Sequence, residues 1–263
     1  MIEKVICVAS HRRSGTHLTI DQVRANFKEV ENFQVLDKVR KNHHSREKPE
    51  LGKIKGGGIV KTHMIPSIEH YDVKKGYKKI SKKILEESKA IYVARNGMDV
   101  MVSLYEYMKS FDEKVRNKEF SSFIRSEHSF EDVKMDRVEF WSYHVKKWVN
   151  KRDKNNMCIV RFEDWKKRFD RTIKKVSDHI GLKRRLVKSN MYKDLSNEGM
   201  MKKVLRKIMP SSFFTESTAI QFRKGKSGDR FEYFNSKDVE FFVEKAGHTL
   251  ERLGYCIPDP KNY

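Results

Sequence analysis

A run of basic, hydroxyl and glycine residues near the start of the chain has the composition of a phosphate-binding loop. The run is Arg12-Arg13-Ser14-Gly15-Thr16-His17. Backbone N–H groups at a helix N-terminus point at a bound anion, a glycine lets the anion approach closely, and a cation adds charge. This run offers all three features. It lacks the GxxxxGK[ST] pattern of a Walker loop, which disfavours an ATPase or a GTPase.

Two later segments also carry basic residues in a form suited to phosphate. One segment runs from Arg95 to Ser103, and the other runs from Phe222 to Asp229. Three phosphate-binding segments in one chain indicate a ligand with phosphate groups at two positions.

In content and order these segments resemble the motifs of the sulfotransferases that use 3′-phosphoadenosine 5′-phosphosulfate (PAPS). That family carries TYPKSGTTW, KTHLP, RNPKDVxVS, YED and RKGxxGD. The matching stretches of this chain are residues 10–18, 61–66, 95–103, 162–164 and 223–229. The resemblance implies a P-loop-like sulfotransferase fold in a single domain over residues 1–263. It also implies sulfuryl transfer from PAPS to a hydroxyl or amine, with release of adenosine 3′,5′-bisphosphate (PAP) and no metal.

The resemblance also assigns the residues that would bind the donor. Those expected around the 5′-phosphosulfate are the loop residues Arg13, Ser14, Gly15, Thr16 and His17, and Arg12 is counted with the donor-binding residues. Those expected around the 3′-phosphate are Arg95, Ser103, Arg223, Lys224 and Gly225. Phe162, at the Tyr position of YED, is counted with the donor-binding residues.

Two residues are predicted to act in catalysis. His63, in Lys61-Thr62-His63, matches the family's general base, and an imidazole with a pKa of about 6.5 can accept a proton from an attacking hydroxyl. Arg13 stands where the soluble family members carry Lys and resembles the loop of the tyrosylprotein sulfotransferases. It keeps the cation that would stabilise negative charge on the leaving phosphate.

The chain departs from the family pattern at several positions. Leu18 replaces the loop Trp that in the family packs on adenine, and Phe162 replaces a Tyr. Pro66 comes one residue later than in KTHLP, and Arg12 replaces the loop Pro. The adenine pocket of the family therefore does not carry over as a whole.

His144 is the predicted acceptor-binding residue. It shares one helix face with Trp141 and Trp148, at spacings of three and four residues. One interpretation is a set of core aromatics with a hydrogen-bonded histidine, and the other is that His144 reaches the acceptor pocket. The acceptor is expected to be a small molecule or a glycan, and variable loops such as residues 37–58 and 110–135 would select it.

The elements that would position these residues alternate between strand and helix. The apolar runs 5–9, 58–63, 90–94 and 157–162 predict strands, and the helical patterns lie at 18–27, 81–88, 100–108, 136–149 and 236–253. Such alternation predicts an α/β fold with a central parallel sheet flanked by helices. Residues 37–58 are polar and basic, end in three glycines, and are predicted to form a mobile loop.

Composition limits the partners and the compartment. The 263 residues include 57 Lys and Arg against 36 Asp and Glu, a formal net charge of +21, which favours anionic ligands. Three cysteines without a CxxC pair indicate neither a disulfide framework nor a thiolate zinc site, so a reducing, cytoplasmic setting is expected. No apolar run is long enough to span a bilayer.

Two alternative functions use some of the same features. A nucleotide-dependent phosphotransferase could use the same loop, but the chain lacks the Walker lysine pattern and an obvious carboxylate pair for magnesium. A nucleic-acid-binding protein is indicated by the charge alone, and no readout motif accompanies that charge. Sulfuryl transfer is therefore the leading interpretation.

Overall fold

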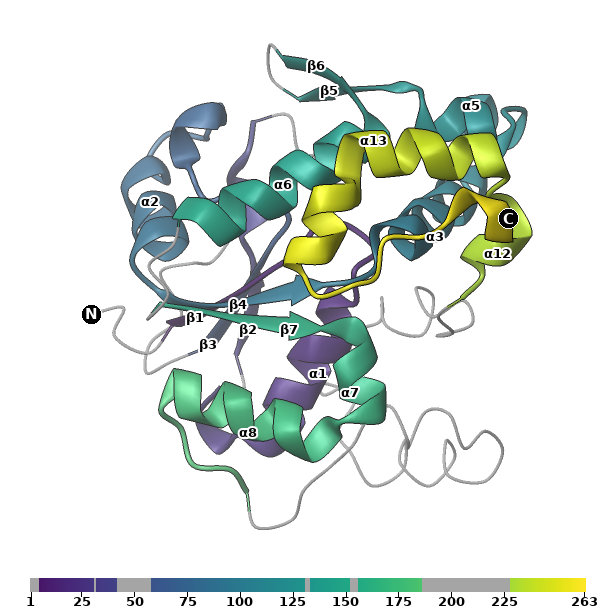
Figure 1. Cartoon of the computed structure of the whole chain (residues 1–263). Coiled ribbons are helices and arrows are strands. Elements are labelled where there is room, and N and C mark those ends of the chain that lie inside the picture. Colours follow the sequence, from purple (N-terminus) through teal and green to yellow (C-terminus); the bar gives the residue numbers. More distant parts are fainter. Residues whose placement is uncertain (1–4, 31, 42–57, 131–132, 152–155, 186–227) are drawn as a thin grey trace. The chain divides into compact units, whose positions relative to one another are not determined.

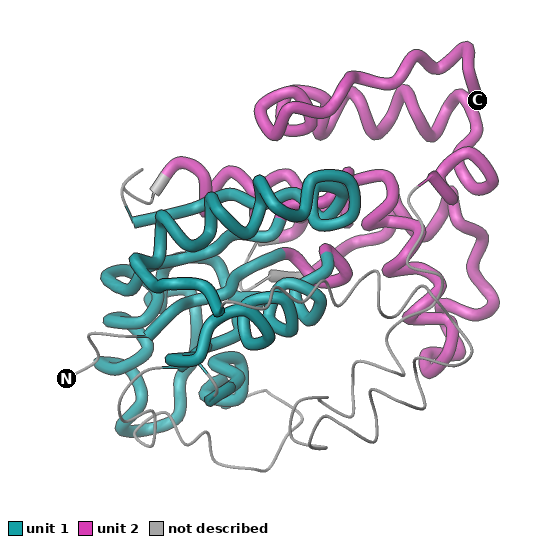
Figure 2. The backbone as a smooth tube through the Cα atoms, turned by 90° about the horizontal axis from the view of Figure 1, so that it is seen from below, with its two compact units in different colours: residues 1–10, 15–93, 152–225 teal, residues 11–14, 94–151, 226–263 magenta. Residues whose placement is uncertain are grey.

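The structure is a computed structural model that describes residues 5–30, 32–41, 58–130, 133–151, 156–185 and 228–263. The chain divides into two compact units (Figure 2). Unit 1 holds residues 1–10, 15–93 and 152–225, and unit 2 holds residues 11–14, 94–151 and 226–263.

A five-stranded sheet with the strand order β2-β3-β1-β4-β7 forms the centre of unit 1. The strands are β1 (Val5–Ala9), β2 (Phe33–Val35), β3 (Gly58–Thr62), β4 (Lys89–Ala94) and β7 (Met157–Arg161). β1 pairs in parallel with β3 and β4, and β2 pairs in parallel with β3. Figure 1 shows β7 running in the same direction as β4. The predicted α/β fold with a central parallel sheet is confirmed.

Helices cover both faces of this sheet. They are α1 (Thr16–Asn26), α2 (Lys78–Glu86), α7 (Phe162–Lys167) and α8 (Phe169–Ile180), with short 3₁₀ turns η1 (Lys28–Val30), η2 (Leu36–Val39) and η4 (Ile68–His70). In Figure 1, α1 and α8 lie below the sheet and α2 lies above it. Because both faces are covered, β1 is a continuous apolar run, VICVA, buried at every position.

The main core of unit 1 lies between the sheet and α1, α7 and α8. Side chains alternate between the faces of a strand, so every second strand residue contributes to this core. From the strands these residues are Ile6, Val8, Ile59, Ile91, Val93, Cys158 and Val160, and from the helices they include Leu18, Val23, Phe162, Trp165 and Val176. Because side chains of β1 and α1 are buried in this one core, the start of α1 is held close to the end of β1.

Unit 2 is mainly helical. Its elements are α3 (Gly97–Lys109), α4 (Glu113–Arg116), α5 (Phe120–Ile124), β5 (Glu127–Phe130), β6 (Val133–Asp136), α6 (Arg137–Lys151), α12 (Arg230–Tyr233), α13 (Ser236–Arg252) and η6 (Pro260–Asn262). β5 and β6 form an antiparallel hairpin. At the start of α3, a Cβ on Gly97 would lie 2.6 Å from Phe242 and 2.8 Å from Trp141, so the backbone approaches these rings closely.

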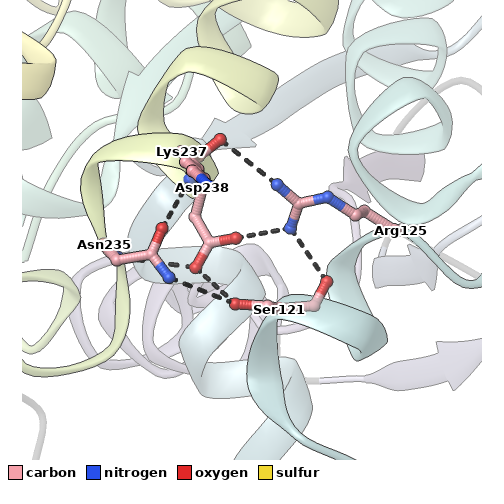
Figure 3. Close-up of polar contacts among 5 residues, drawn as sticks. All are labelled: Ser121, Arg125, Asn235, Lys237 and Asp238. Atoms are coloured by element: carbon pink, nitrogen blue, oxygen red, sulfur yellow. Dashed lines mark hydrogen bonds and ion pairs between the residues drawn. The ribbon is translucent and has the colours of Figure 1, made fainter.

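A polar network joins α5 to the start of α13 (Figure 3). The buried carboxylate of Asp238 accepts a hydrogen bond from Ser121 Oγ at 2.7 Å and forms an ion pair with Arg125. Asn235 Oδ1 accepts from Asp238 N at 2.9 Å, and Asp238 accepts from Asn235 N in return, which is a capping box. These contacts define where α13 begins.

Some elements differ from the sequence prediction. Strand β2 and the β5–β6 hairpin were not predicted, and residues 110–135, expected to be a loop, include α4 and α5. The predicted mobile loop at residues 37–58 lies mostly outside the described residues, but its first residues belong to the 3₁₀ turn η2. Within the described part of the chain, no helix is both long enough and apolar enough to cross a membrane.

Candidate active site

The connection between β1 and α1 has the backbone form of an anion-binding loop. Two residues adopt left-handed conformations, Arg13 with φ 67° and Gly15 with φ 95°. Ser14 N donates to His11 O at 3.3 Å, and Gly15 is the N-cap of α1. Left-handed residues are common in anion-binding loops, and the N-terminus of a helix attracts anions.

Gly15 is required at its position for two separate reasons. Its φ of 95° disfavours any other residue, and an added Cβ would lie 2.4 Å from Cδ2 of Phe162. Phe162 is buried in the core of unit 1, and Lys166 Nζ lies 4.5 Å from its ring centroid. Phe162 therefore packs against the loop at Gly15. That Phe162 contacts the donor stays a prediction.

His63 directly follows β3, next to the residue that follows β1. The parallel register pairs Ala9 with Thr62, so Ser10 and His63 come together at the ends of neighbouring strands. His63 Nδ1 lies 2.8 Å from the carbonyl oxygen of Ser10. A carbonyl only accepts, so Nδ1 carries the hydrogen and the basic lone pair of the neutral ring is on Nε2.

The backbone of His63 is fixed by Asp37. Both carboxylate oxygens of Asp37 accept from His63 N at 3.1 Å, and Oδ1 also accepts from Thr62 Oγ1 at 3.0 Å. Asp37 is buried. Asp37 was not predicted as a site residue, because it lies in a segment predicted to be a loop and its partners are 25 and 26 residues further along the chain.

The side chains of Thr16 and His17 contact the ends of the two strands. Thr16 Oγ1 lies 2.5 Å from Ser10 Oγ. Lys61, in β3, donates from Nζ to His17 Nε2 at 2.7 Å. Lys61 therefore adds a cation beside the first turn of α1. Lys61 belongs to the motif Lys61-Thr62-His63, but no role was predicted for it.

In unit 2 three predicted donor-binding residues meet. Arg13 Nε donates to Ser103 Oγ at 3.2 Å, and Arg95 Nη1 donates to the carbonyl oxygen of Arg13 at 3.1 Å. The guanidinium of Arg13 also lies over the ring of Tyr107, 4.7 Å from its centroid. The residue predicted for the 5′-phosphosulfate thus contacts two residues predicted for the 3′-phosphate.

The second segment predicted for the 3′-phosphate is described only at its end, since Arg223, Lys224 and Gly225 lie outside the described residues. The buried carboxylate of Asp99, in α3, accepts from Gly228 N and from Arg230 Nη1, each at 3.3 Å. Asp99 therefore ties the end of this segment to the segment from Arg95 to Ser103.

His144 lies inside unit 2, with no exposed surface. Its ring centroid is 5.6 Å from that of His11 and 6.2 Å from that of Phe140. Burial, together with His144, holds the pKa of His11 well below its usual value, although His11 Nδ1 bonds to Arg12 O at 2.9 Å. His11 is therefore neutral near pH 7. The acceptor-binding role of His144 stays a prediction.

The remaining loop positions differ in exposure. Arg12 is exposed and Ser14 is buried. Leu18, at the Trp position of the family motif, is 2% exposed and belongs to the core of unit 1. The side chain of Leu18 therefore packs inward, unlike a ring that stacks on a base.

Comparison with known proteins decides the family. A model of the sulfotransferase domain matches residues 3–254. The chain belongs to the sulfotransferase family. Its relatives include sulfotransferase 1C2 of Rattus norvegicus, 28% identical over 183 residues, or 64% of this chain and 57% of that protein. Sulfotransferase 2A2 of the same species is 22% identical over 262 residues, 91% of this chain and 82% of that protein.

Solved structures share the fold of this sulfotransferase family member. Mouse sulfotransferase SULT7A1, complexed with PAP, has a TM-score of 0.63 at 20% identity, covering 94% of this chain and 84% of that one. Retinol dehydratase in complex with androsterone and the inactive cofactor PAP has a TM-score of 0.60 at 18% identity, covering 95% of this chain and 82% of that one. The alignment with rat sulfotransferase 1C2 spans less than two thirds of that protein's length.

Each unit, taken by itself, holds groups that suit a negatively charged donor. The guanidinium of Arg13 and the hydroxyl of Ser103 are bonded to each other, and Arg95 joins them through the backbone of Arg13. Guanidinium and hydroxyl groups are preferred partners of phosphate oxygens. Gly15 has no side chain that could accept hydrogen bonds from the first N–H groups of α1. These N–H groups therefore suit an anion at the start of the helix.

Proposed function

We propose that this sulfotransferase transfers the sulfuryl group of PAPS to a hydroxyl or amine of a small-molecule or glycan acceptor and releases PAP. The observation that carries the proposal is the orientation of His63. Its ring is fixed through Nδ1 by the Ser10 carbonyl, and its backbone is fixed by Asp37. Ser10 begins the phosphate loop, so a base and an anion-binding loop start from the ends of paired strands. Family membership supports sulfuryl transfer over the kinase and nucleic-acid alternatives.

The donor would supply an activated sulfuryl group and a bisphosphate leaving group. We assign the 5′ end of the donor to the loop from Arg12 to His17. The 3′-phosphate is assigned to Arg95, Ser103 and the segment from Arg223 to Gly225. The bond from Asp99 to Gly228 supports this second assignment, because it holds the end of that segment to α3.

His63 and Arg13 would carry the chemistry. His63 would accept the proton of the attacking hydroxyl or amine at Nε2, since Nδ1 is engaged as a donor. The guanidinium of Arg13 would stabilise the negative charge that develops as the sulfuryl group leaves its phosphate. Both steps use groups already oriented by other residues of this chain.

Nucleotide binding tests the proposed function. PAP should raise the melting temperature more than AMP at equal concentration, because PAP engages both phosphate-binding regions and AMP only one. A ligand at one hundred times its Kd stabilises by about 2.7 kcal/mol. The measurement is a thermal shift with both nucleotides, and Arg95→Met should reduce the advantage of PAP. Equal protection by the two nucleotides, or none, would contradict the proposal.

Substitution of His63 tests its role as the base. His63→Asn keeps a side-chain N–H donor near the position of Nδ1 but removes the basic Nε2, so sulfuryl transfer should slow by about 10² to 10⁴-fold. PAP affinity should hardly change. The measurement is single-turnover transfer from PAPS, across pH, to an acceptor found by screening alcohols, phenols, amines and glycans. A variant with the rate and pH profile of the wild type would exclude His63 as the base.

A further inference from the structure

The side chain and backbone of Arg13 are held by one continuous segment of unit 2. Arg95 Nη1 donates to its carbonyl oxygen at 3.1 Å, and its own Nε donates to Ser103 at 3.2 Å. Its guanidinium carbon lies 4.7 Å from the centroid of the Tyr107 ring. Ser103 and Tyr107 are four residues apart on α3, so they lie on the same face of the helix.

This arrangement suits an arginine and not a lysine. A guanidinium is planar, so it can lie over an aromatic face while its Nε donates sideways to a hydroxyl. The two Nη groups carry four of its five N–H donors and are the groups a phosphosulfate would meet. An ammonium in place of the guanidinium has no planar face and no Nε donor. The loop has Arg13 where the soluble family members carry Lys, and the contacts of Ser103 and Tyr107 suit this arginine.

Tyr107 has little role in the core. Its side chain is 38% exposed, and its aromatic neighbour Phe111 is 61% exposed, with 5.0 Å between the ring centroids. Loss of a ring this exposed costs little folding stability, since surface substitutions usually have small effects. The contact with Arg13 is what distinguishes Tyr107 from Phe111.

We propose that Tyr107 is a positioning residue for sulfuryl transfer, whose ring holds the guanidinium of Arg13 in the orientation that stabilises the transferring group. This inference rests on the proposed function, because it assigns the stabilising charge to Arg13. It concerns the aromatic face alone, so phenylalanine should serve as well as tyrosine.

The experiment is a double-mutant cycle. Tyr107→Leu, Tyr107→Phe and the matched control Phe111→Leu are each made with Arg13 and with Arg13→Met. Two quantities are measured: PAP affinity by calorimetry, and the single-turnover release of labelled sulfate from PAPS to water with enzyme in excess. Melting temperatures of all variants identify any that fail to fold.

We expect Tyr107→Leu to slow sulfate release by about two- to fivefold, the range of an exposed cation–π contact. Tyr107→Phe and Phe111→Leu should each keep the wild-type rate of sulfate release. In the Arg13→Met chain, Tyr107→Leu should have no further effect. Equal losses in both backgrounds, or a Tyr107→Phe variant as slow as Tyr107→Leu, would overturn the inference. A wild type that neither binds PAP nor releases sulfate would instead overturn the proposed function, and the inference with it.

Discussion

Two buried aspartates, one in each unit, have opposite surroundings. Asp238 in unit 2 is 1% exposed and accepts hydrogen bonds from Ser121, Asn235 and Arg125 (Figure 3). Asp21 in α1 of unit 1 is 6% exposed, and within the described part of the chain its Oδ1 has no hydrogen-bond partner. Burial raises the pKa of Asp21 to about 7, against the opposing charge of Arg24.

The difference shows that depth of burial alone does not decide how a carboxyl group is surrounded, because Asp238 has three hydrogen-bond donors beside it and Asp21 Oδ1 has none in the described part of the chain. Asp238 lies in the first turn of α13, where backbone N–H groups and a guanidinium are at hand. Asp21 lies inside α1, where the backbone N–H groups are used by the helix itself. A carboxyl group in that position gains from being protonated, because the neutral form costs less to bury.

Removing the partnered aspartate should have the larger effect. Asp238→Ala leaves the donors of Ser121, Asn235 and Arg125 without their acceptor and removes the capping box, so we expect a loss of about 3–5 kcal/mol in the free energy of unfolding. Urea unfolding monitored by circular dichroism measures it. Glu240→Ala, at an exposed position of the same helix, is the matched control and should change stability by about 0.5 kcal/mol at most. If Asp238→Ala and Glu240→Ala had the same free energy of unfolding, the network around Asp238 would contribute nothing to stability.

Replacing Asp21 should have a smaller effect of opposite sign. The pKa of Asp21 is higher in the folded chain than its ordinary 3.8, so the folded chain binds the proton more tightly. That contribution is fully present below about pH 4 and is lost as the pH rises through about 7, by up to about 1.4 kcal/mol per pH unit. At pH 8, Asp21→Asn should therefore be about 2–4 kcal/mol more stable than the wild type.

The test of Asp21 is the pH dependence of the difference between the two chains. Unfolding free energies are compared from pH 4 to pH 8, with Asp178→Asn, at an exposed position of α8, as the control. The gain from Asp21→Asn should grow between pH 4 and pH 7 and then level off. A gain that stays constant over this range would mean that Asp21 is ionised throughout.

The elements of the fold were largely predictable, because they follow from local pattern. The strands at residues 5–9 and 157–161 are short apolar runs, and the helix at 236–252 shows a clear apolar face. Strand β2 was missed because it has only three residues, none fully buried, at the edge of the sheet. The β5–β6 hairpin was missed because it has no strong alternation of apolar residues.

The sequence motifs name candidate site residues, but they do not predict the contacts of those residues. The motifs name His63, Arg13 and Ser103, yet the partners that orient them come from distant parts of the chain. Asp37 bonds to His63 across 26 residues, and Arg13 bonds to Ser103 across 90. Local pattern carries no signal for such pairs. They appear only once the sheet register and the position of α3 are known.

The pairing of β1 with β3 limits which changes of chain length this fold can accept. Val8 stands opposite Lys61 and Ala9 opposite Thr62, so His63 comes beside Ser10 only in this register. Since side chains alternate along a strand, one residue inserted into β3 would turn His63 to the opposite face and exchange the side chains that β3 presents to the two sides of the sheet. The number of residues from Gly58 to His63 is therefore constrained, because an insertion or deletion there would separate His63 from its contacts with Ser10 and Asp37.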